Sequence, residues 1–328
     1  MLFIGVDGGG TKTLALALDG HTGRFALKET GPGNPSVIGF AQAGSRVKDV
    51  VEQAIAGLSG DVTCAFSLCV ALAGVGRGQD RARMRELLQG FWPHAQIVVI
   101  VDPHAALLAG TAGESGVVLI AGTGSMAYGM NPEGDTARAG GFGYLLGDEG
   151  SGFAIGQAGL AAALTATEGR GPDTVLLSVA ATYFGESEQE VGTHLPAFLW
   201  QVYAQSEPVR TIAGFAREVL AYATIDAVAH SIIQRAVASQ VALVRSVRTR
   251  LSGLSPTVLL AGGLIGQDNY LRSSLIAELA ECDCRVLTRP PVTGACLMAI
   301  REAGQETEQS RETWREVADR VTQGIQIR

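Results

Sequence analysis

Between Leu2 and Leu18 the chain has the sequence L-F-I-G-V-D-G-G-G-T-K-T-L-A-L-A-L. The short apolar runs Leu2–Val6 and Leu14–Leu18 predict two buried strands. Asp7–Thr13 lies between them as a glycine-rich loop, and Arg24–Glu29 predicts a third strand after two glycine-containing turns. The order strand, glycine loop, strand, turn, strand predicts an antiparallel unit at the start of the chain.

The position of the glycine loop separates this chain from two common nucleotide-binding folds. In Rossmann and P-loop units the loop leads from a strand into a helix, whereas here it leads into a second strand. Gly5 and Gly10 have P-loop spacing, but Thr11-Lys12-Thr13 follows where a P-loop has Lys and then Ser or Thr. The chain also has no complete G-x-G-x-x-G.

The opening pattern recurs in the middle of the chain. Gly116–Ile120 predicts a strand, Ala121–Ser125 is a loop of small residues, and Met126–Met130 predicts a second strand. A turn and a short third strand are expected to follow. Two such repeats that face each other would give two α/β lobes with a cleft between them.

The expected domains are residues 1–112 and residues 113–304, with a hinge near Gly110–Glu114. Residues 153–250 have Ala and Leu at helical spacing and predict a helical insertion in the second lobe. The charged tail, 305–328, has Trp314, Val317 and Val321 on one helical stripe. It predicts an amphipathic helix that completes the first lobe.

Composition excludes several classes of protein. The 328 residues carry a net charge of −7, so the overall field does not attract nucleic acid or anionic membrane. The apolar runs are interrupted well before the length of a membrane span, and no basic leader precedes Leu2. Five cysteines, an odd number, indicate reduced thiols. We therefore expect a cytoplasmic enzyme without nucleic-acid or membrane partners.

The first loop has the groups that a phosphate site needs. Gly9 and Gly10 let backbone N–H groups approach a phosphate, and Thr11, Lys12 and Thr13 add hydroxyls and a positive charge. Asp7, at the end of a strand, is a candidate for holding Mg²⁺ through water. A tight hairpin turn would explain the glycines alone, but not this whole set.

Three further segments are candidates with weaker individual signals. Gly122–Ser125 repeats the first loop without its lysine, and a plain turn is the alternative. Ala261–Gly263 follows a predicted strand and would let adenosine lie against the backbone, with a strand-to-helix turn as the alternative. Gly140–Gly152 is the densest glycine region and is interpreted as a ligand loop rather than a solvated one, because so much glycine costs folding entropy.

Asp102 is the candidate general base. It follows the predicted strand Gln96–Val101 and precedes the predicted helix His104–Gly110, which is a usual place for active-site residues in α/β folds. The residues alone leave a second interpretation open, in which Asp102 is the N-cap of that helix.

The three loops, in this order, resemble the nucleotide motifs of the actin/hexokinase/heat-shock-protein ATPase superfamily. More closely, the chain is similar to the BadF/BadG/BcrA/BcrD-type ATPase family, which includes the N-acetylglucosamine kinases. The segments that carry this similarity are D-G-G-G-T-K-T, G-N-P-S (Gly33–Ser36), V-D-P-H-A-A-L (Val101–Leu107), A-G-T-G-S, G-D-E-G-S-G (Gly147–Gly152) and P-V-T-G-A (Pro291–Ala295).

The resemblance implies two actin-like (ribonuclease H-like) α/β lobes, each with a mixed sheet that opens with a three-stranded antiparallel unit, and a nucleotide in the cleft between them. It also implies ATP and Mg²⁺ as cofactors and phosphorylation of an amino sugar. Asp102 corresponds to the base that accepts the proton of the sugar 6-hydroxyl. The implied sugar contacts, besides Asp102, are Asn34, Gly141, Phe142 and Asp148. The implied phosphate contacts are Gly9, Gly10, Thr11, Lys12, Thr13, Gly122, Thr123, Gly124 and Ser125, the adenosine contacts are Gly262 and Gly263, and Asp7 lies near Mg²⁺.

Two residues depart from the mammalian N-acetylglucosamine kinases. Met126 stands where those enzymes have Asn, and Phe142 stands where they have Trp. N-acetylglucosamine is the expected acceptor, with glucosamine and N-acetylmuramic acid as alternatives. Homodimers are common among the relatives, so a homodimer is one option for the assembly.

Two other functions are possible for this fold. Some relatives are ATPase activators that use an iron–sulfur cluster, but no Cys lies near Gly122–Ser125 or Asp148. A non-catalytic sugar sensor need not keep Asp7, Lys12 and Asp102 together. Zinc is not expected either, because the Cys-rich motif of the zinc-containing sugar kinases is missing.

Overall fold

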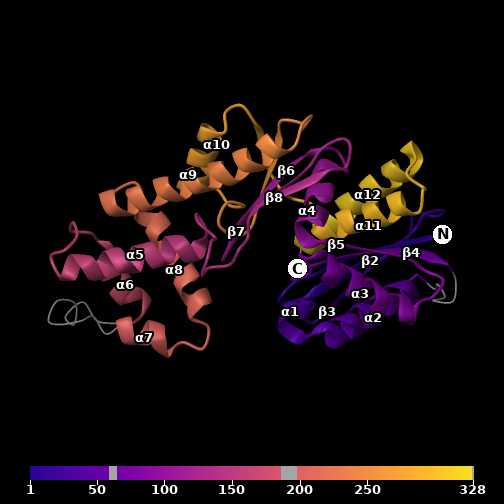
Figure 1. The fold of residues 1–328 in the computed structure, drawn as a ribbon, viewed down its shortest axis with the longest axis horizontal. Coiled ribbons are helices and arrows are strands. Elements are labelled where there is room, and N and C mark those ends of the chain that lie inside the picture. The colour runs from indigo at the N-terminus through magenta and orange to yellow at the C-terminus, as the bar shows by residue number, and fades with distance from the viewer. Residues whose placement is uncertain (59–64, 186–197, 327–328) are drawn as a thin grey trace. The chain divides into compact units, whose positions relative to one another are not determined.

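The structure is a computed structural model that describes residues 1–58, 65–185 and 198–326. Cys64, one of the five cysteines, and the last two residues of the tail lie outside these residues. The chain divides into two compact units. The first combines Met1–Ser115 with Leu287–Arg328, and the second is Gly116–Val286 (Figure 1).

The first unit contains a five-stranded sheet with the order β3-β2-β1-β4-β5. Its strands are β1 (Leu2–Gly8), β2 (Thr13–Asp19), β3 (Phe25–Thr30), β4 (Phe66–Leu72) and β5 (Gln96–Val101). β1, β2 and β3 are antiparallel neighbours, and β4 and β5 continue the sheet parallel to β1. The predicted antiparallel opening unit is confirmed.

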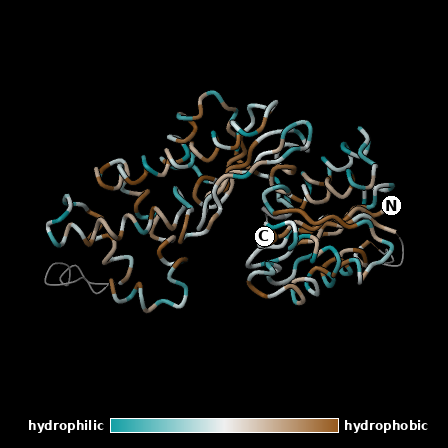
Figure 2. The backbone as a smooth tube through the Cα atoms, viewed as in Figure 1, coloured by the Kyte–Doolittle hydropathy of each residue, from teal (hydrophilic) through white to brown (hydrophobic). Residues whose placement is uncertain are grey.

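Helices cover both faces of this sheet (Figure 1). They are α1 (Pro35–Ile38), α2 (Phe40–Ala56), α3 (Gly78–Phe91), α4 (Asp102–Thr111), α11 (Pro291–Glu302) and α12 (Glu308–Gln326). Because alternate strand residues point to opposite faces, Ile4 and Val6 pack with α2 and α3, whereas Phe3 packs with α11 and α12. Both faces are therefore apolar, and the strands are largely brown in Figure 2.

The second unit repeats the sheet, with the order β8-β7-β6-β9-β10. Its strands are β6 (Gly116–Ala121), β7 (Ser125–Met130), β8 (Thr136–Gly140), β9 (Thr257–Ala261) and β10 (Asp283–Val286). Antiparallel and parallel pairs fall at the same places as in the first sheet. The predicted internal repeat is therefore confirmed strand by strand.

The helical insertion lies between β8 and β9. Its helices are α5 (Gly152–Thr167), α6 (Leu176–Tyr183), α7 (Phe198–Ala204), α8 (Pro208–Tyr222) and α9 (Ala227–Arg250), and α10 (Tyr270–Glu278) follows β9. By length and composition α9 is the one described helix that could cross a membrane. Its apolar residues Ile233, Val237 and Val244 belong to the core of the second unit, where α9 packs on β6, β7 and β8.

The division of the chain differs from the expected one at α11. The expected second domain included residues 287–304, but α11 packs on β1, β4 and α4 in the first unit. An alanine placed at Gly5 of β1 would put its Cβ 2.2 Å from the backbone nitrogen of Cys296. Gly5 thus lets α11 lie directly against the sheet, a contact between residues almost 300 positions apart that no local pattern reveals.

Candidate active site

The first glycine loop is a tight turn that closes on itself and on the following segment. The Gly9 N–H donates to the Lys12 carbonyl at 2.9 Å, which closes the loop. The Gly9 carbonyl accepts from the N–H groups of Gly33 and Asn34 at 3.0 and 3.1 Å. Gly10, Thr11 and Lys12 are exposed. The loop therefore presents the exposed backbone and cation that the sequence predicts for a phosphate site.

Three charged residues of the first unit interact at the carboxyl end of its parallel strands. Asp7 lies near the end of β1, and Asp102 follows the last residue of β5, with β4 between the two strands. Burial and the charge of Asp102 raise the pKa of Asp7 to about 6, while the Lys12 charge opposes this rise. Lys12 also forms a half-exposed ion pair with Glu29, with Nζ 3.5 Å from Oε2.

The N-cap interpretation of Asp102 is wrong. Val101 is the N-cap of α4, and Asp102 is the first helical residue, with Pro103 behind it. Pro at this position is well tolerated, and an acid in the first turn is stabilised by the helix dipole. The helix thus begins two residues before the predicted His104.

Asn34 lies beside the first loop. It caps the short helix α1, because its Oδ1 accepts the Ser36 N–H at 2.9 Å. Gly74, which follows β4 at φ +83°, lies so close that a Cβ there would be 2.2 Å from this Oδ1. The first unit therefore brings Asn34 together with the Gly9 loop at the carboxyl end of β1 and β4.

Two of the predicted phosphate ligands are buried in structural roles instead. Thr13 begins β2, is fully buried, and donates its hydroxyl to the Gly31 carbonyl at 2.9 Å. Ser125 begins β7, the equivalent position in the repeat, and donates its hydroxyl to the Glu149 carbonyl at 2.8 Å. Each hydroxyl group thus links the end of a glycine turn to a later loop of the chain. Because its proton is used in this internal hydrogen bond, the hydroxyl does not donate to a phosphate in this structure.

The glycine-rich segment after β8 places the proposed sugar ligands of the second unit. Gly141 donates its N–H to the Ser125 carbonyl at 2.9 Å and lies against the Met126 side chain. Phe142 is mostly exposed, with the Arg138 guanidinium 5.4 Å from its ring centre. Asp148 is buried and in contact with Gly124, where a Cβ would be 2.7 Å from Oδ2. Asp148 therefore adjoins Gly122–Ser125, the second predicted phosphate loop.

The second predicted phosphate loop and the predicted adenosine loop, Ala261–Gly263, line one cavity of about 910 Å³ in the second unit. The Leu264 N–H donates to the Ala121 carbonyl at 3.1 Å, and Gly262, at φ +94°, lies against the Ala121 backbone. Gly122, Thr123 and Gly263 line the cavity. This volume is in the range of small-molecule sites, and its floor is the backbone of two glycine turns.

The other wall of this cavity contains no residue that the sequence predicted for the site. That wall comes from α8 and the turn after it, and from the residues that lead into α10 together with Tyr270, the first residue of α10. Its residues are Arg210, Ala213, Gly214, Ala216, Arg217, Leu220, Ala221, Thr224, Gln267, Asp268, Asn269 and Tyr270. The α8 residues recur every three or four positions, which is one helix face. Their alternation of small side chains with Arg was a signal that could have indicated a ligand-facing helix.

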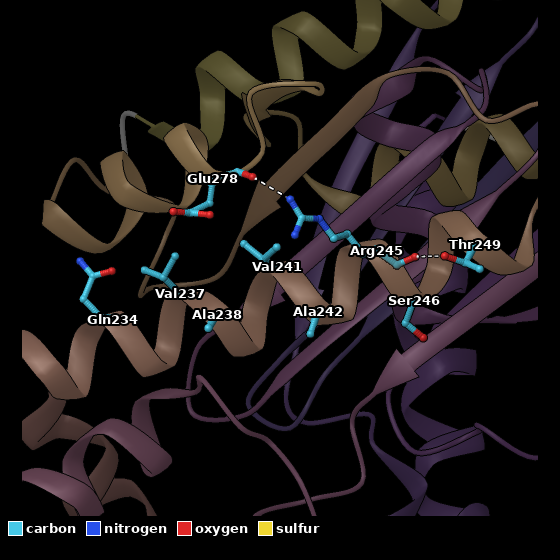
Figure 3. Close-up of a pocket in the computed structure, with 9 residues that line it drawn as sticks. All are labelled: Gln234, Val237, Ala238, Val241, Ala242, Arg245, Ser246, Thr249 and Glu278. Carbon is cyan, nitrogen blue, oxygen red and sulfur yellow. Dashed lines mark hydrogen bonds between the residues drawn. The ribbon is translucent and has the colours of Figure 1, made fainter.

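A second hollow of about 550 Å³ lies between α9 and α10 and contains none of the predicted residues (Figure 3). Val237 and Val241 form its floor, and Arg245 bridges to the Glu278 carbonyl at 3.2 Å.

The donor set suits Mg²⁺ held mainly through water and phosphate. In the part of the chain that the structure describes, no three His, Cys, Asp or Glu side chains form a metal-binding group. Mg²⁺ needs only one or two carboxylates when substrate phosphates complete its shell. Asp7 at the end of β1, with Asp102 at the end of β5, would supply carboxylates of that number.

Two repeated five-stranded sheets with glycine turns at matching places define an actin-like ATPase fold. The structure of a proposed N-acetylglucosamine kinase from Chromobacterium violaceum has this fold, with a TM-score of 0.67, 24% identity and coverage of 91% of this chain and 98% of that one. The chain belongs to the BadF/BadG/BcrA/BcrD ATPase family, whose sequence profile matches residues 4–297.

Curated relatives are sugar kinases. The N-acetylmuramic acid/N-acetylglucosamine kinase of Clostridium acetobutylicum is 30% identical over 273 residues, which cover 82% of this chain and 87% of that protein. The N-acetyl-D-glucosamine kinase of Dictyostelium discoideum is 32% identical over 222 residues, covering 63% of this chain and 69% of that protein.

Proposed function

We propose that this protein is an ATP-dependent amino-sugar kinase that converts N-acetylglucosamine to N-acetylglucosamine 6-phosphate. Glucosamine and N-acetylmuramic acid are the alternative acceptors. The observation that carries the proposal is the pairing of Asp102 with a phosphate-type glycine loop at one edge of the first sheet, in a chain whose curated relatives phosphorylate amino sugars. Its substrates are two small molecules, and we place the reaction in the cytoplasm, where ATP is available.

In the proposed reaction the sugar hydroxyl oxygen attacks the γ-phosphorus of ATP. The bond from that phosphorus to the β,γ-bridging oxygen breaks, ADP leaves, and Asp102 accepts the hydroxyl proton. Phosphoryl transfer asks a protein mainly for positioning and charge stabilisation. The loop N–H groups and Lys12 would stabilise the phosphate charge, and Asp7 would hold Mg²⁺, which neutralises charge on the β- and γ-phosphates when bound.

The remaining site residues are assigned on the same basis. Asn34, Gly141, Phe142 and Asp148 would contact the sugar, and Gly262 and Gly263 would lie at the adenosine. Closure of the protein over its bound substrates would exclude water from the reacting groups and suppress hydrolysis of ATP.

The proposal is tested by ADP release from MgATP with N-acetylglucosamine, glucosamine, N-acetylmuramic acid, glucose or no sugar. We expect release with one amino sugar and a loss of at least about 10²-fold in Asp102→Asn, the lower range for removal of a general base. Asp80→Asn is the matched control, because Asp80 lies in the first turn of α3 as Asp102 lies in the first turn of α4. Equal release with and without every sugar would contradict the proposal and favour an ATPase activator.

A further inference from the structure

Asp148 has an unusual backbone conformation for a buried acid. Its φ is +61°, in the left-handed region that non-glycine residues seldom adopt. Its side chain is only 8% exposed and touches Gly124 of the second phosphate loop. Such a conformation persists only where surrounding contacts impose it, and these positions cluster at ligand sites.

Two side chains from separate elements hold the turn that follows Asp148. Ser125 of β7 donates to the Glu149 carbonyl at 2.8 Å. Gln240 of α9 donates its Nε2–H to the Gly150 carbonyl at 2.7 Å. The Asp148 carbonyl itself accepts the Ser151 N–H at 3.1 Å. Every carbonyl from Asp148 to Gly150 is therefore bonded, which leaves the turn little freedom.

Core packing does not explain why position 240 has a polar glutamine side chain. It is fully buried on a helix whose neighbouring inward residues, such as Ala236 and Val244, are apolar. Its Oε1 has no hydrogen-bond partner among the described residues. A buried acceptor without a partner lowers stability, and an apolar residue of similar size would avoid that cost. The compensating gain is the hydrogen bond to Gly150.

The turn also rests directly on α9. Gly150 has φ +78°, and a Cβ there would lie 2.8 Å from the Ala236 carbonyl and 3.0 Å from Cγ of Gln240. Ala236 and Gln240 are one helical turn apart and share a face of α9. The hollow of Figure 3 is lined by Ala238, Ala242 and Arg245, which lie on a different face.

We propose that Gln240 is a positioning residue for the sugar acceptor: through the Gly150 carbonyl it holds the Asp148 turn so that the carboxylate stays beside the second phosphate loop. The inference rests on the proposed function for the role of Asp148, but the hold of Gln240 on the turn does not. Gln240 is not proposed to contact either substrate, and it would affect acceptor binding only through the position of Asp148.

The test compares Gln240→Met with wild type in hydrogen–deuterium exchange and in steady-state kinetics. Exchange over residues 147–152 should quicken, because the turn loses its anchor. KM for the acceptor should rise about tenfold while KM for MgATP changes less than about twofold. Gln89→Met is the matched control. Gln89 lies on α3, and its side-chain amide also donates to backbone carbonyls, those of Trp92, Pro93 and Ala95 just after the helix. This control variant should change neither the exchange rate over residues 147–152 nor the KM for the acceptor.

A double-mutant cycle with Asp148→Asn separates positioning from general destabilisation. If Gln240 acts through Asp148, Gln240→Met should add less than about a twofold loss once Asp148→Asn is present. Independent losses, or equal rises in both KM values, would overturn the proposal. Unchanged exchange over residues 147–152 would overturn it whatever the substrate proves to be. A wild-type protein inactive with every sugar would refute the proposed function, and the exchange result would still decide the role of Gln240.

Discussion

Asp7, next to the first glycine loop, is a partly buried acid with a raised pKa. Burial and the nearby charge of Asp102 raise its pKa from 3.8 to about 6. An acid with a raised folded-state pKa favours the folded protein when protonated, and this contribution is lost as the pH rises from about 4 through about 6. At neutral pH the ionised Asp7 therefore lowers the free energy of unfolding.

Asp7→Asn should stabilise the protein at high pH while impairing catalysis. The variant should exceed wild type by on the order of 2 kcal/mol at pH 8, with the difference shrinking through pH 6 and vanishing near pH 4. Urea unfolding of both proteins across this range measures it. Asp19→Asn should instead be less stable than wild type at high pH, because hydrogen bonds from Thr22 and His21 stabilise the ionised carboxylate and lower the pKa of Asp19. A constant difference between pH 4 and pH 8 would show that the Asp7 pKa is not raised.

At the scale of elements, glycines set how closely α11 approaches its neighbours. Gly5 of β1 has no side chain, so the backbone of α11 can pack directly against this strand. Gly294 of α11 has the same effect at α4, because a Cβ on Gly294 would lie 2.0 Å from the Ala105 carbonyl oxygen. Gly294 belongs to the P-V-T-G-A segment that carries part of the family resemblance. Its role here is the packing of α11 against α4, the helix that begins at Asp102.

Gly5→Ala should separate α11 from the sheet. The added methyl meets backbone atoms, which cannot rotate away, so we expect a loss of about 3 kcal/mol or more in the free energy of unfolding. Gly90→Ala, in α3 with open space around the added Cβ, should instead gain about 0.5–1 kcal/mol. Chemical denaturation of the two variants measures both. A neutral Gly5→Ala would mean that α11 does not lie against β1 as described.

At the scale of the whole molecule, the first unit is built from both ends of the chain. Trp314 of α12 is almost fully buried in its core and donates Nε1–H to the Thr293 carbonyl of α11 at 2.7 Å. The Arg289 guanidinium lies 5.5 Å from its ring centre. The C-terminal segment is thus part of the core that carries Asp7 and Asp102.

Trp314→Ala should destabilise the first unit by about 3–5 kcal/mol, because it removes a large buried side chain and a hydrogen bond. Hydrogen–deuterium exchange should quicken in β1, β4 and β5 more than in β6 and β9. Trp200→Ala is the matched control, since Trp200 of α7 is 66% exposed and its loss should cost less than about 1 kcal/mol. Equal acceleration in both sheets would show that the units unfold together.

Local sequence patterns were sufficient to predict the strands, the glycine loops and their repetition. Short apolar runs bounded by glycine, as in Leu2–Val6 and Gly116–Ile120, are local signals, and strand formation and tight turns depend on residues a few positions apart. The recurrence of one pattern was enough to predict two similar sheets, and the motif residues were enough to predict the family.

Which of those residues are exposed and which hold the fold together depends on contacts that form only when the chain folds. Thr13 and Ser125 have the side chains of phosphate ligands, yet their hydroxyls bond Gly31 and Glu149 within the protein. The assignment of α11 to the first unit and the anchoring of Gly150 by Gln240 join residues far apart in the chain. Such contacts, and the pKa shift of Asp7, depend on burial and on neighbours brought together by folding, and these leave no fixed spacing in a sequence.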